Sequence, residues 1–263
     1  MCRMFAYAAP DLTNAEDELE SDGVASITAL ARLHADGWGW AGVGGDNPII
    51  PEVTKSPLPA STDPNFVSAL AMPARAAMVH LRWATLGLQI EADNTHPFLH
   101  DGISFEHNGS LKPIERMRSL LSEDSLAGMR GMTDSEMYFA LIREHAADSD
   151  SLPEATVAAA RQIRANFPAS SLNAMLLSPR HLIVVHSSAK SVLDAEDLVE
   201  AAQFDLPDEH ADDYFALRWR RKSDGTVVVA SSGLSEPDWE PIPAETVMVV
   251  RLADCSVQML PLF

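Results

Sequence analysis

The sequence contains very few cysteines. Only Cys2 and Cys255 occur among its 263 residues, too few for a disulfide framework or for a structural zinc site, which needs several clustered ligands. Three histidines suggest metal ligands at first sight, but His80, His100 and His107 have no acidic or cysteine partners at ligand spacing. We therefore expect free thiols, no metal site and no other cofactor.

Basic residues are also scarce. The chain has 19 Lys and Arg against 38 Asp and Glu, a formal net charge of -19. A negative field of this size repels phosphate backbones and anionic lipid surfaces. This charge argues against nucleic-acid binding and against membrane-surface binding.

A long hydrophobic run is missing too. The most apolar stretch, residues 172–186, is interrupted by Pro179, Arg180 and other polar residues, far short of the roughly 18 apolar residues that a membrane span needs. The first twenty residues hold one basic side chain, Arg3, among several acidic ones, the reverse of a secretory signal. We expect a cytoplasmic protein.

The apolar content of the chain is high enough to build a globular core. Apolar residues make up 46% of the chain, and we find no repeat, low-complexity tract or obvious linker, so residues 1–263 are interpreted as a single domain. Strand patterns come first, helical patterns follow, and strand patterns return, which indicates a mixed α+β domain. The expected strands are 2–9, 37–43, 76–84, 103–105, 174–177, 182–186, 214–220, 227–231, 247–252 and 257–260. The expected helices are 21–33, capped by Ser21 or Asp22, 111–121 after Ser110, 134–147 after Thr133 and 153–166 after Ser151.

Three further segments have a distinctive composition. A proline-rich stretch, 48–64, predicts surface loop. The acidic stretch 194–213 predicts a solvated helix and loop. The basic run Arg218, Arg220, Arg221 and Lys222 is either a contact site or, as we favour, an exposed charged edge of a sheet.

Position 2 carries the most chemical information. Removal of the initiator Met1 would leave Cys2 with a thiol and a free α-amine on one residue. An α-amine titrates near 8 and a thiol near 8.5, so the amine can take the thiol proton at neutral pH. This pairing is typical of N-terminal-nucleophile hydrolases, although a buried cysteine that merely comes second would look the same.

Three motifs supply groups that such chemistry can use. Arg82 ends a buried strand in His80-Leu81-Arg82-Trp83-Ala84-Thr85-Leu86-Gly87, where a guanidinium suits a small-molecule α-carboxylate. The segment His107-Asn108-Gly109-Ser110 places an amide and a glycine N–H at a strand end, which is what an oxyanion hole requires. In Thr133-Asp134-Ser135-Glu136, Asp134 either caps a helix or holds a substrate ammonium group.

Together the motifs resemble those of the class II glutamine amidotransferases, a branch of the N-terminal-nucleophile hydrolases. The resemblance rests on Met1-Cys2, Arg82-Trp83-Ala84-Thr85, Asn94-Thr95-His96-Pro97, His107-Asn108-Gly109 and Asp134-Ser135-Glu136, in the family's order over the first half of the chain. It implies a four-layer αββα sandwich with Cys2 on a central strand.

The resemblance also implies roles for individual residues. Cys2 is the expected nucleophile, Asn108 and Gly109 are the expected oxyanion donors, and Arg82 and Asp134 are expected to bind the substrate α-carboxylate and α-amine. Trp83, Thr85 and His96 are expected to shape the pocket rather than to react. These last three complete the list of candidate site residues.

Departures from the family pattern bear on the substrate. Synthase-linked members usually begin Cys-Gly-Ile and have His before the glycine of the arginine motif, whereas this chain has Arg3, Met4 and Leu86. The opening Cys2-Arg3 and the segment Asp36-Gly37-Trp38-Gly39 look like the stand-alone branch that includes ergothioneine-pathway and γ-glutamyl dipeptide amidohydrolases. Too few residues follow Asp134 for a fused synthase, so we expect any ammonia-using partner to be a separate chain.

The leading hypothesis is therefore an amidohydrolase that cleaves a γ-glutamyl amide, either glutamine or a conjugate, through a Cys2 thioester. One alternative is a glutaminase subunit that delivers ammonia to a separate synthase or amidase subunit. Another is a non-catalytic glutamine or glutamate sensor. Loss of Cys2, Asn108 or Asp134 would have favoured the sensor, and all three are present.

Overall fold

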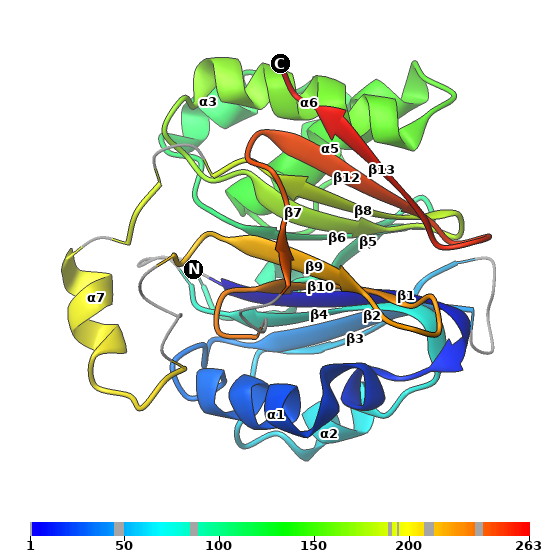
Figure 1. The fold of residues 1–263 in the computed structure, drawn as a ribbon. Coiled ribbons are helices and arrows are strands. Elements are labelled where there is room, and N and C mark those ends of the chain that lie inside the picture. The colour runs from blue at the N-terminus through cyan, green and yellow to red at the C-terminus, as the bar shows by residue number, and fades with distance from the viewer. Residues whose placement is uncertain are drawn as a thin grey trace.

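A computed structural model describes residues 2–44, 50–84, 89–188, 191–193, 195–207, 213–234 and 239–263. Two antiparallel sheets lie face to face, and helices cover the outer face of each (Figure 1). The expected four-layer αββα sandwich is confirmed. No helix among the residues just given is long and apolar enough to cross a membrane.

The first sheet has seven strands in the order β11-β9-β10-β1-β4-β2-β3. Its central strand β1 is buried on both faces over its first eight residues, which explains the nearly continuous apolar run at the start of the chain. The strands are β1 (Cys2–Thr13), β2 (Trp38–Val43), β3 (Glu52–Ser56), β4 (Ala74–Arg82), β9 (Leu217–Arg221), β10 (Val227–Ser231) and β11 (Glu240–Pro241).

The second sheet has six strands in the order β13-β12-β8-β7-β6-β5. The strands are β5 (Phe98–His100), β6 (Ile103–Asn108), β7 (Asn173–Leu177), β8 (His181–His186), β12 (Thr246–Arg251) and β13 (Ser256–Pro261). Alternate residues of β1, β4, β7 and β8, such as Met4, Met78, Met175 and Val184, form the buried layer between the sheets. Burial of this layer holds the two sheets together.

Helices complete the outer layers. The first sheet is covered by α1 (Ala15–Leu30) and α2 (Pro64–Leu70), and the second by α5 (Asp134–Ala147) and α6 (Leu152–Asn166) (Figure 1). Short helices α3 (Ile114–Arg118) and α4 (Glu123–Ala127) pack against α5, η1 (Ala92–Asn94) is a single 3-10 turn, and α7 (Ala195–Ala201) lies at the side of the sandwich. The core therefore has three layers: one between the sheets and one under each helical cover.

Most predicted elements are confirmed, but two helices are corrected. The predicted helix 21–33 corresponds to the second part of α1, which the non-helical backbone of Glu20 (φ 60°) divides in two. A first part, which was not predicted, begins at Ala15, where Asn14 caps it by accepting a hydrogen bond from the Asp17 N–H at 2.8 Å. The predicted helix 111–121 is reduced to α3, since the Leu111 N–H bonds to Asp134 and Pro113 has no N–H to give.

The proline-rich and acidic segments can also be compared with expectation. The proline-rich stretch contains β3 and the start of α2, so it is not all loop. The acidic stretch forms α7 as expected, but positions 194 and 208–212 lie outside the described residues.

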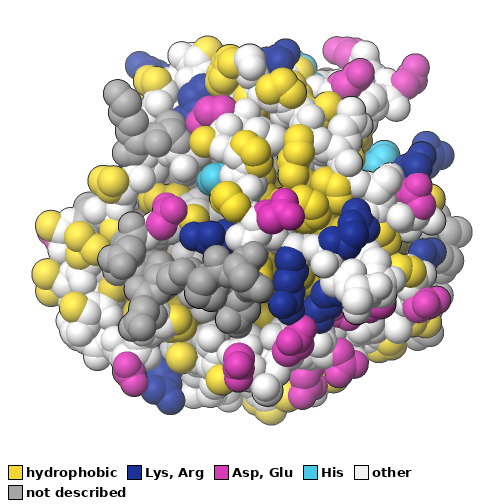
Figure 2. Space-filling view, in the orientation of Figure 1, with side chains coloured by type: hydrophobic (Ala, Val, Ile, Leu, Met, Phe, Trp, Pro, Cys, Tyr) yellow, Lys and Arg dark blue, Asp and Glu magenta, His cyan; other side chains and the backbone are white. Residues whose placement is uncertain are grey.

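The basic run is not a free edge. Strand β9 pairs on both sides, Arg220 contacts Glu20 at 2.7 Å, and Lys222 contacts Glu18 at 3.0 Å. Figure 2 shows Lys and Arg side chains gathered near the middle of one face, with acidic side chains beside them. Ion pairing with the first turns of α1 thus accounts for part of the run.

Candidate active site

Cys2 lies where the central strand of one sheet meets the end of a strand of the other. It is the first residue of β1, it pairs in register with Arg82 at the end of β4, and it is 6% exposed. Its backbone N donates to Oδ1 of Asn108, the last residue of β6, at 2.9 Å. Two motifs more than a hundred residues apart are therefore in direct contact.

A cavity of about 30 Å³ opens at this point. Its size corresponds to roughly one water molecule, so a substrate must widen it to enter. Most of the candidate residues line this cavity. The lining consists of Cys2, Arg82, Trp83, Ala84, Asn94, His96, His107, Gly109, Thr133, Asp134 and Ser135.

Asn108 and Gly109 are held by a neighbouring loop. The Ser171 hydroxyl donates to the Asn108 carbonyl at 2.7 Å. A Cβ at position 109 would lie 2.1 Å from the Ser171 carbonyl oxygen, so only glycine permits this approach of the two backbones. Because Asn108 accepts the Cys2 N–H through Oδ1, its Nδ2 group is the donor that remains for a substrate oxygen.

His107 connects the same loop to helix α5. Its Nε2 lies 3.1 Å from the Ser171 carbonyl and its Nδ1 lies 2.9 Å from the Ser135 hydroxyl. A carbonyl only accepts, so Nε2 carries the proton and Nδ1 accepts from Ser135. Burial lowers the pKa of His107, which keeps the ring neutral. The residue has a structural role that the sequence did not indicate.

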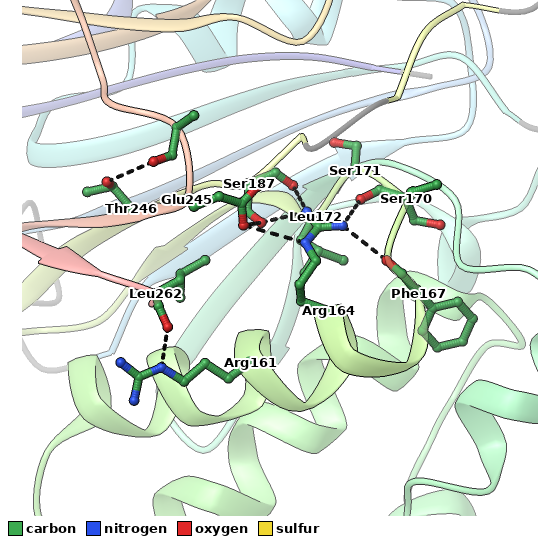
Figure 3. A network of polar contacts seen from close by, with 12 residues as sticks. Arg161, Arg164, Phe167, Ser170, Ser171, Leu172, Ser187, Glu245, Thr246 and Leu262 are labelled. Atoms are coloured by element: carbon green, nitrogen blue, oxygen red, sulfur yellow. Dashed lines mark hydrogen bonds and ion pairs between the residues drawn. The ribbon is translucent and has the colours of Figure 1, made fainter.

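A second network fixes the far side of this loop (Figure 3). Arg164 in α6 donates through Nη1 to the carbonyls of Phe167 and Ser170, at 3.0 and 2.6 Å. Through Nη2 it donates to the Ser187 carbonyl and hydroxyl, each at 2.6 Å, and Glu245 lies 3.5 Å from its Nε. The buried guanidinium thus ties the residues just before Ser171 to β8 and to the loop before β12.

The end of β1 is held by an arginine as well. Arg3 is fully buried and donates through Nε to the Cys2 carbonyl at 2.7 Å, and through its other nitrogens to Ser232 and to the Tyr214 carbonyl. Its guanidinium also lies 3.6 Å from the centre of the Tyr214 ring. Arg3 is a departure from the family pattern in the sequence, where a charged residue in a strand of apolar residues could have signalled such a network.

Arg82 has its guanidinium in the cavity wall without an acidic partner. It donates to the carbonyls of Asp36 and Gln89, at 3.2 and 3.5 Å, and it is 3% exposed. Among the described residues no carboxylate forms an ion pair with it. A buried cation in this state favours an anionic ligand.

Asp134 is the first residue of α5 but not its cap. Thr133 caps the helix by accepting the Glu136 N–H, so the alternative in which Asp134 serves as the cap is wrong. The Asp134 carboxylate instead accepts the N–H groups of Leu111 at 2.5 Å and of Ser135 at 2.9 Å. These bonds fix a carboxylate in the wall of the cavity that holds Cys2.

The remaining candidates form the sides of the pocket. The Trp83 ring meets the His34 ring edge-on, with centroids 5.6 Å apart. His96 packs on His80 at 4.3 Å, and burial lowers the pKa of His80 to about 3 and that of His96 well below its usual value. Both rings are therefore neutral, and His96 forms part of the cavity wall. Thr85 lies outside the described residues.

The three histidines considered as metal ligands each contact different residues. His80 packs on His96, His107 bonds to Ser135 and Ser171, and His100 contacts Asp101 at 3.0 Å near the surface. Within the described ranges, no three His, Cys, Asp or Glu side chains are arranged to hold a metal ion.

Comparison with known proteins gives consistent results. The family model for glutamine amidotransferases class-II matches residues 1–261. Glutamine–fructose-6-phosphate aminotransferase (isomerizing) of Aliivibrio fischeri is 30% identical over 116 residues, which are 44% of this chain and 18% of that protein. The chain thus aligns with less than a fifth of that relative's length.

Solved structures show the same fold. A glutamine aminotransferase class-II domain protein from Silicibacter pomeroyi has a TM-score of 0.62 and 16% identity, over 99% of this chain and 100% of that chain. Glutamine phosphoribosylpyrophosphate amidotransferase from B. subtilis has a TM-score of 0.63 and 14% identity, over 100% of this chain and 49% of that chain. With a family match over almost the whole length and the two-sheet fold, the chain belongs to the class-II glutamine amidotransferases.

Proposed function

We propose that the protein hydrolyses a γ-glutamyl amide, glutamine or a γ-glutamyl conjugate, with Cys2 as nucleophile. The observation that carries this proposal is the 2.9 Å hydrogen bond between the Cys2 N and Asn108 Oδ1, in the wall of a cavity shared with Arg82 and Asp134. It joins a nucleophile, a base on the same residue and an oxyanion donor. No other part of the chain combines these groups among the described residues.

The two charged groups suit the glutamyl end of the substrate. Arg82 supplies a guanidinium for the α-carboxylate, and Asp134 supplies a fixed carboxylate for the α-ammonium group. With both ends of the amino-acid group bound, the γ-carbonyl is placed over the Cys2 sulfur. Positioning of this kind lowers the barrier by restricting the reactants to a reactive geometry.

The chemistry then follows from the groups at hand. After removal of Met1, the free α-amine of Cys2 takes the thiol proton, and the sulfur attacks the γ-carbonyl carbon. The oxyanion that forms is stabilised by the Asn108 amide and the Gly109 N–H. The α-ammonium returns the proton to the departing amine as the C–N bond breaks, and water then attacks the γ-glutamyl thioester to release glutamate and the thiol.

The test is glutamate release from L-glutamine by the purified protein after Met1 removal. Cys2→Ala is expected to abolish release. Cys255→Ala is the matched control, because this other thiol is buried against the Ala8 carbonyl far from the cavity lining, and it should retain activity. Acid quenching followed by mass spectrometry should show a glutamyl adduct on Cys2 in the active protein.

Two outcomes would contradict the proposal. Release that persists in Cys2→Ala would exclude Cys2 as nucleophile. A folded, processed protein that binds glutamine or a γ-glutamyl dipeptide, releases glutamate from neither and forms no adduct would instead support the non-catalytic sensor.

A further inference from the structure

The first residues of β1 pair with a neighbouring strand on one side only. Strand β4 pairs with β1 from Cys2 onward, whereas β10 pairs with it from Phe5 onward, where Phe5 faces Ala230. Removal of Met1 makes Cys2 the end of the chain, and chain ends fray unless other contacts hold them. In the described part of the chain, side chains and not a strand hold the nucleophile on the β10 side.

The side chain of Arg3 bridges this gap. Its Nε donates to the Cys2 carbonyl at 2.7 Å, and its Nη1 donates to the carbonyl and the hydroxyl of Ser232 at 2.9 and 2.7 Å. Ser232 directly follows the last residue of β10, so the guanidinium joins the two strands where their pairing ends. The Met4 N–H next to it donates to the Ser231 hydroxyl at 3.1 Å. Side-chain hydrogen bonds thus take the place of the backbone bonds that a longer β10 would supply.

The guanidinium is itself held in one orientation. Its Nη2 donates to the Tyr214 carbonyl at 3.0 Å, and its central carbon lies 3.6 Å from the centre of the Tyr214 ring. The Ser232 hydroxyl donates to the same carbonyl at 3.1 Å. Burial lowers the pKa of Arg3, Tyr214 and Cys2 offset part of this effect, and an arginine remains charged in proteins. A planar cation that is bonded along several edges has little freedom to turn.

Cys2 is thereby held at both ends of its backbone. Its N donates to Asn108 Oδ1 at 2.9 Å, and its carbonyl accepts from Arg3 at 2.7 Å. The α-amine and the side-chain sulfur of Cys2 are attached to the carbon atom and the side chain that lie between these two groups. The two bonds therefore set where the base and the nucleophile lie. Arg3 is fully buried and is not among the residues that line the cavity, so it acts on the reaction through Cys2.

We propose that Arg3 is a positioning residue for the nucleophile: by holding the Cys2 carbonyl, it keeps the thiol and the α-amine in the geometry that attack on the substrate requires. The inference rests on the proposed function and deepens it. A residue that only places the nucleophile affects the chemical step. It leaves binding of the glutamyl end, which is assigned to Arg82 and Asp134, unchanged.

The test is steady-state glutamate release by the Arg3→Lys protein after Met1 removal, with L-glutamine and a γ-glutamyl dipeptide as substrates. Lysine keeps the charge but carries its donors on one atom, so it cannot bond to Cys2, Ser232 and Tyr214 together. A displacement of about 1 Å at the reacting groups can cost about 100-fold in rate. We expect kcat to fall about tenfold to 100-fold while KM stays within about twofold, the split that marks an effect on the chemical step.

A milder variant covers the case in which Arg3→Lys does not fold. Ser232→Ala removes one acceptor of the guanidinium and leaves the Ser232 carbonyl in place. It should lower kcat several-fold, again without raising KM. Hydrogen exchange followed by mass spectrometry gives a readout besides activity: exchange at the start of β1 should become faster in both variants, while exchange in β7 should not change.

Arg218→Lys is the matched control. Arg218 lies in β9 of the same sheet and donates to the Trp239 carbonyl at 3.4 Å. Like Arg3, it forms no ion pair within the described residues, but it has no contact with Cys2 there. It should keep the kcat of the unmodified protein.

The outcomes separate this inference from the proposed function. An active unmodified protein whose kcat is unchanged in folded Arg3→Lys, or in Ser232→Ala if Arg3→Lys does not fold, would overturn the positioning role alone. So would an equal loss of kcat in Arg218→Lys, or a loss of kcat/KM that lies entirely in KM. If the unmodified, processed protein releases glutamate from neither substrate and forms no adduct on Cys2, the proposed function fails and the positioning role fails with it.

Discussion

At the scale of single residues, the site depends on how backbone groups are packed as much as on which side chains react. Gly109 lies against the Ser171 carbonyl, and Asp134 is fixed by the Leu111 N–H. Both contacts join segments that are distant in sequence. Substitutions at these two positions therefore test the geometry of the oxyanion and ammonium sites.

Gly109→Ala should impair the chemical step. The added Cβ would meet the Ser171 carbonyl at 2.1 Å, so the 108–109 backbone must shift and the oxyanion donors move with it. Loss of one such donor lowers kcat by about 10² to 10³. The measurement is steady-state glutamate release. Gly128→Ala is the control, since its Cβ would meet nothing closer than 3.5 Å. Equal kcat values in the two variants would contradict the oxyanion assignment.

Asp134→Asn should weaken substrate binding. An amide cannot form an ion pair with the substrate ammonium, and an interaction of this type is worth about 1.5–3 kcal/mol, so KM should rise about tenfold or more. The melting temperature should be recorded alongside, because the amide can replace only one of the two backbone bonds made by Asp134. A KM that does not change in a folded variant would count against the ammonium role.

At the scale of secondary-structure elements, the ends of helices position several residues of the site. The C-terminal turn of α6 fixes the loop that contacts Asn108 and Gly109, through Arg164. The N-terminus of α5 places Asp134 and Ser135, and the N-terminus of α1 begins at a cap that the sequence analysis missed. Two predictions concern these helix ends.

Arg164→Met should destabilise the fold and lower kcat. It removes the hydrogen bonds from a buried cation to the carbonyls of Phe167, Ser170 and Ser187, and a hydrogen bond to a charged group contributes about 1.5–3 kcal/mol. Arg161→Met is the control on the same helix, because within the described residues Arg161 bonds to the carbonyls of Pro261 and Leu262, away from this loop; Figure 3 shows the bond to Leu262. Urea unfolding gives the stability and glutamate release gives kcat. Similar losses in both variants would contradict a specific role for Arg164.

Asn14→Ala should destabilise the protein by about 1 kcal/mol, the usual cost of losing an N-cap. Ser21→Ala should have a smaller effect: Ser21 begins the second part of α1, but among the described residues its hydroxyl contacts the neighbouring Asp22 carboxylate and no backbone N–H. Urea unfolding of both variants compares the cap at Asn14 with the start of the second part of α1. A larger loss from Ser21→Ala would contradict the greater contribution of the Asn14 cap.

At the scale of the whole molecule, buried ionisable groups determine how stability depends on pH. Burial lowers the pKa values of His80, His96, His107 and His186. Burial, with a smaller contribution from the nearby Cys2, raises the pKa of Glu106 well above its usual value, and this carboxyl has no hydrogen-bond partner within the described residues. The histidines and the glutamate act in opposite directions between pH 7 and pH 5.

The unfolding free energy should therefore fall as the pH drops from 7 to 5. The unfolded chain takes up protons on histidines with a pKa near 6.5, whereas the folded chain keeps these rings neutral, and each excess proton changes the slope by about 1.4 kcal/mol per pH unit. Glu106 opposes this with one proton held in the folded state, so Glu106→Gln should steepen the fall. Urea unfolding at pH 5, 6 and 7 measures both slopes. A stability that rises toward pH 5 would contradict neutral buried histidines.

The sequence by itself determined the fold class, the family motifs and most of the elements. Continuous apolar runs such as residues 227–231 predicted buried strands, and Thr133 and Ser151 marked the starts of α5 and α6, because apolar patterning and capping are local properties. The chemistry of Cys2, Arg82, Asn108 and Asp134 could also be inferred from residue type.

Only the tertiary structure decided how these groups meet. The contact of Ser171 with Gly109 and the burial of Arg3 beside Cys2 depend on segments that lie far apart in the chain. The cavity that Cys2 lines likewise arises where β1, β4, β6 and α5 come together. Local sequence preferences carry no information about such contacts, because the contacts contribute to the folding free energy only once the two sheets have packed.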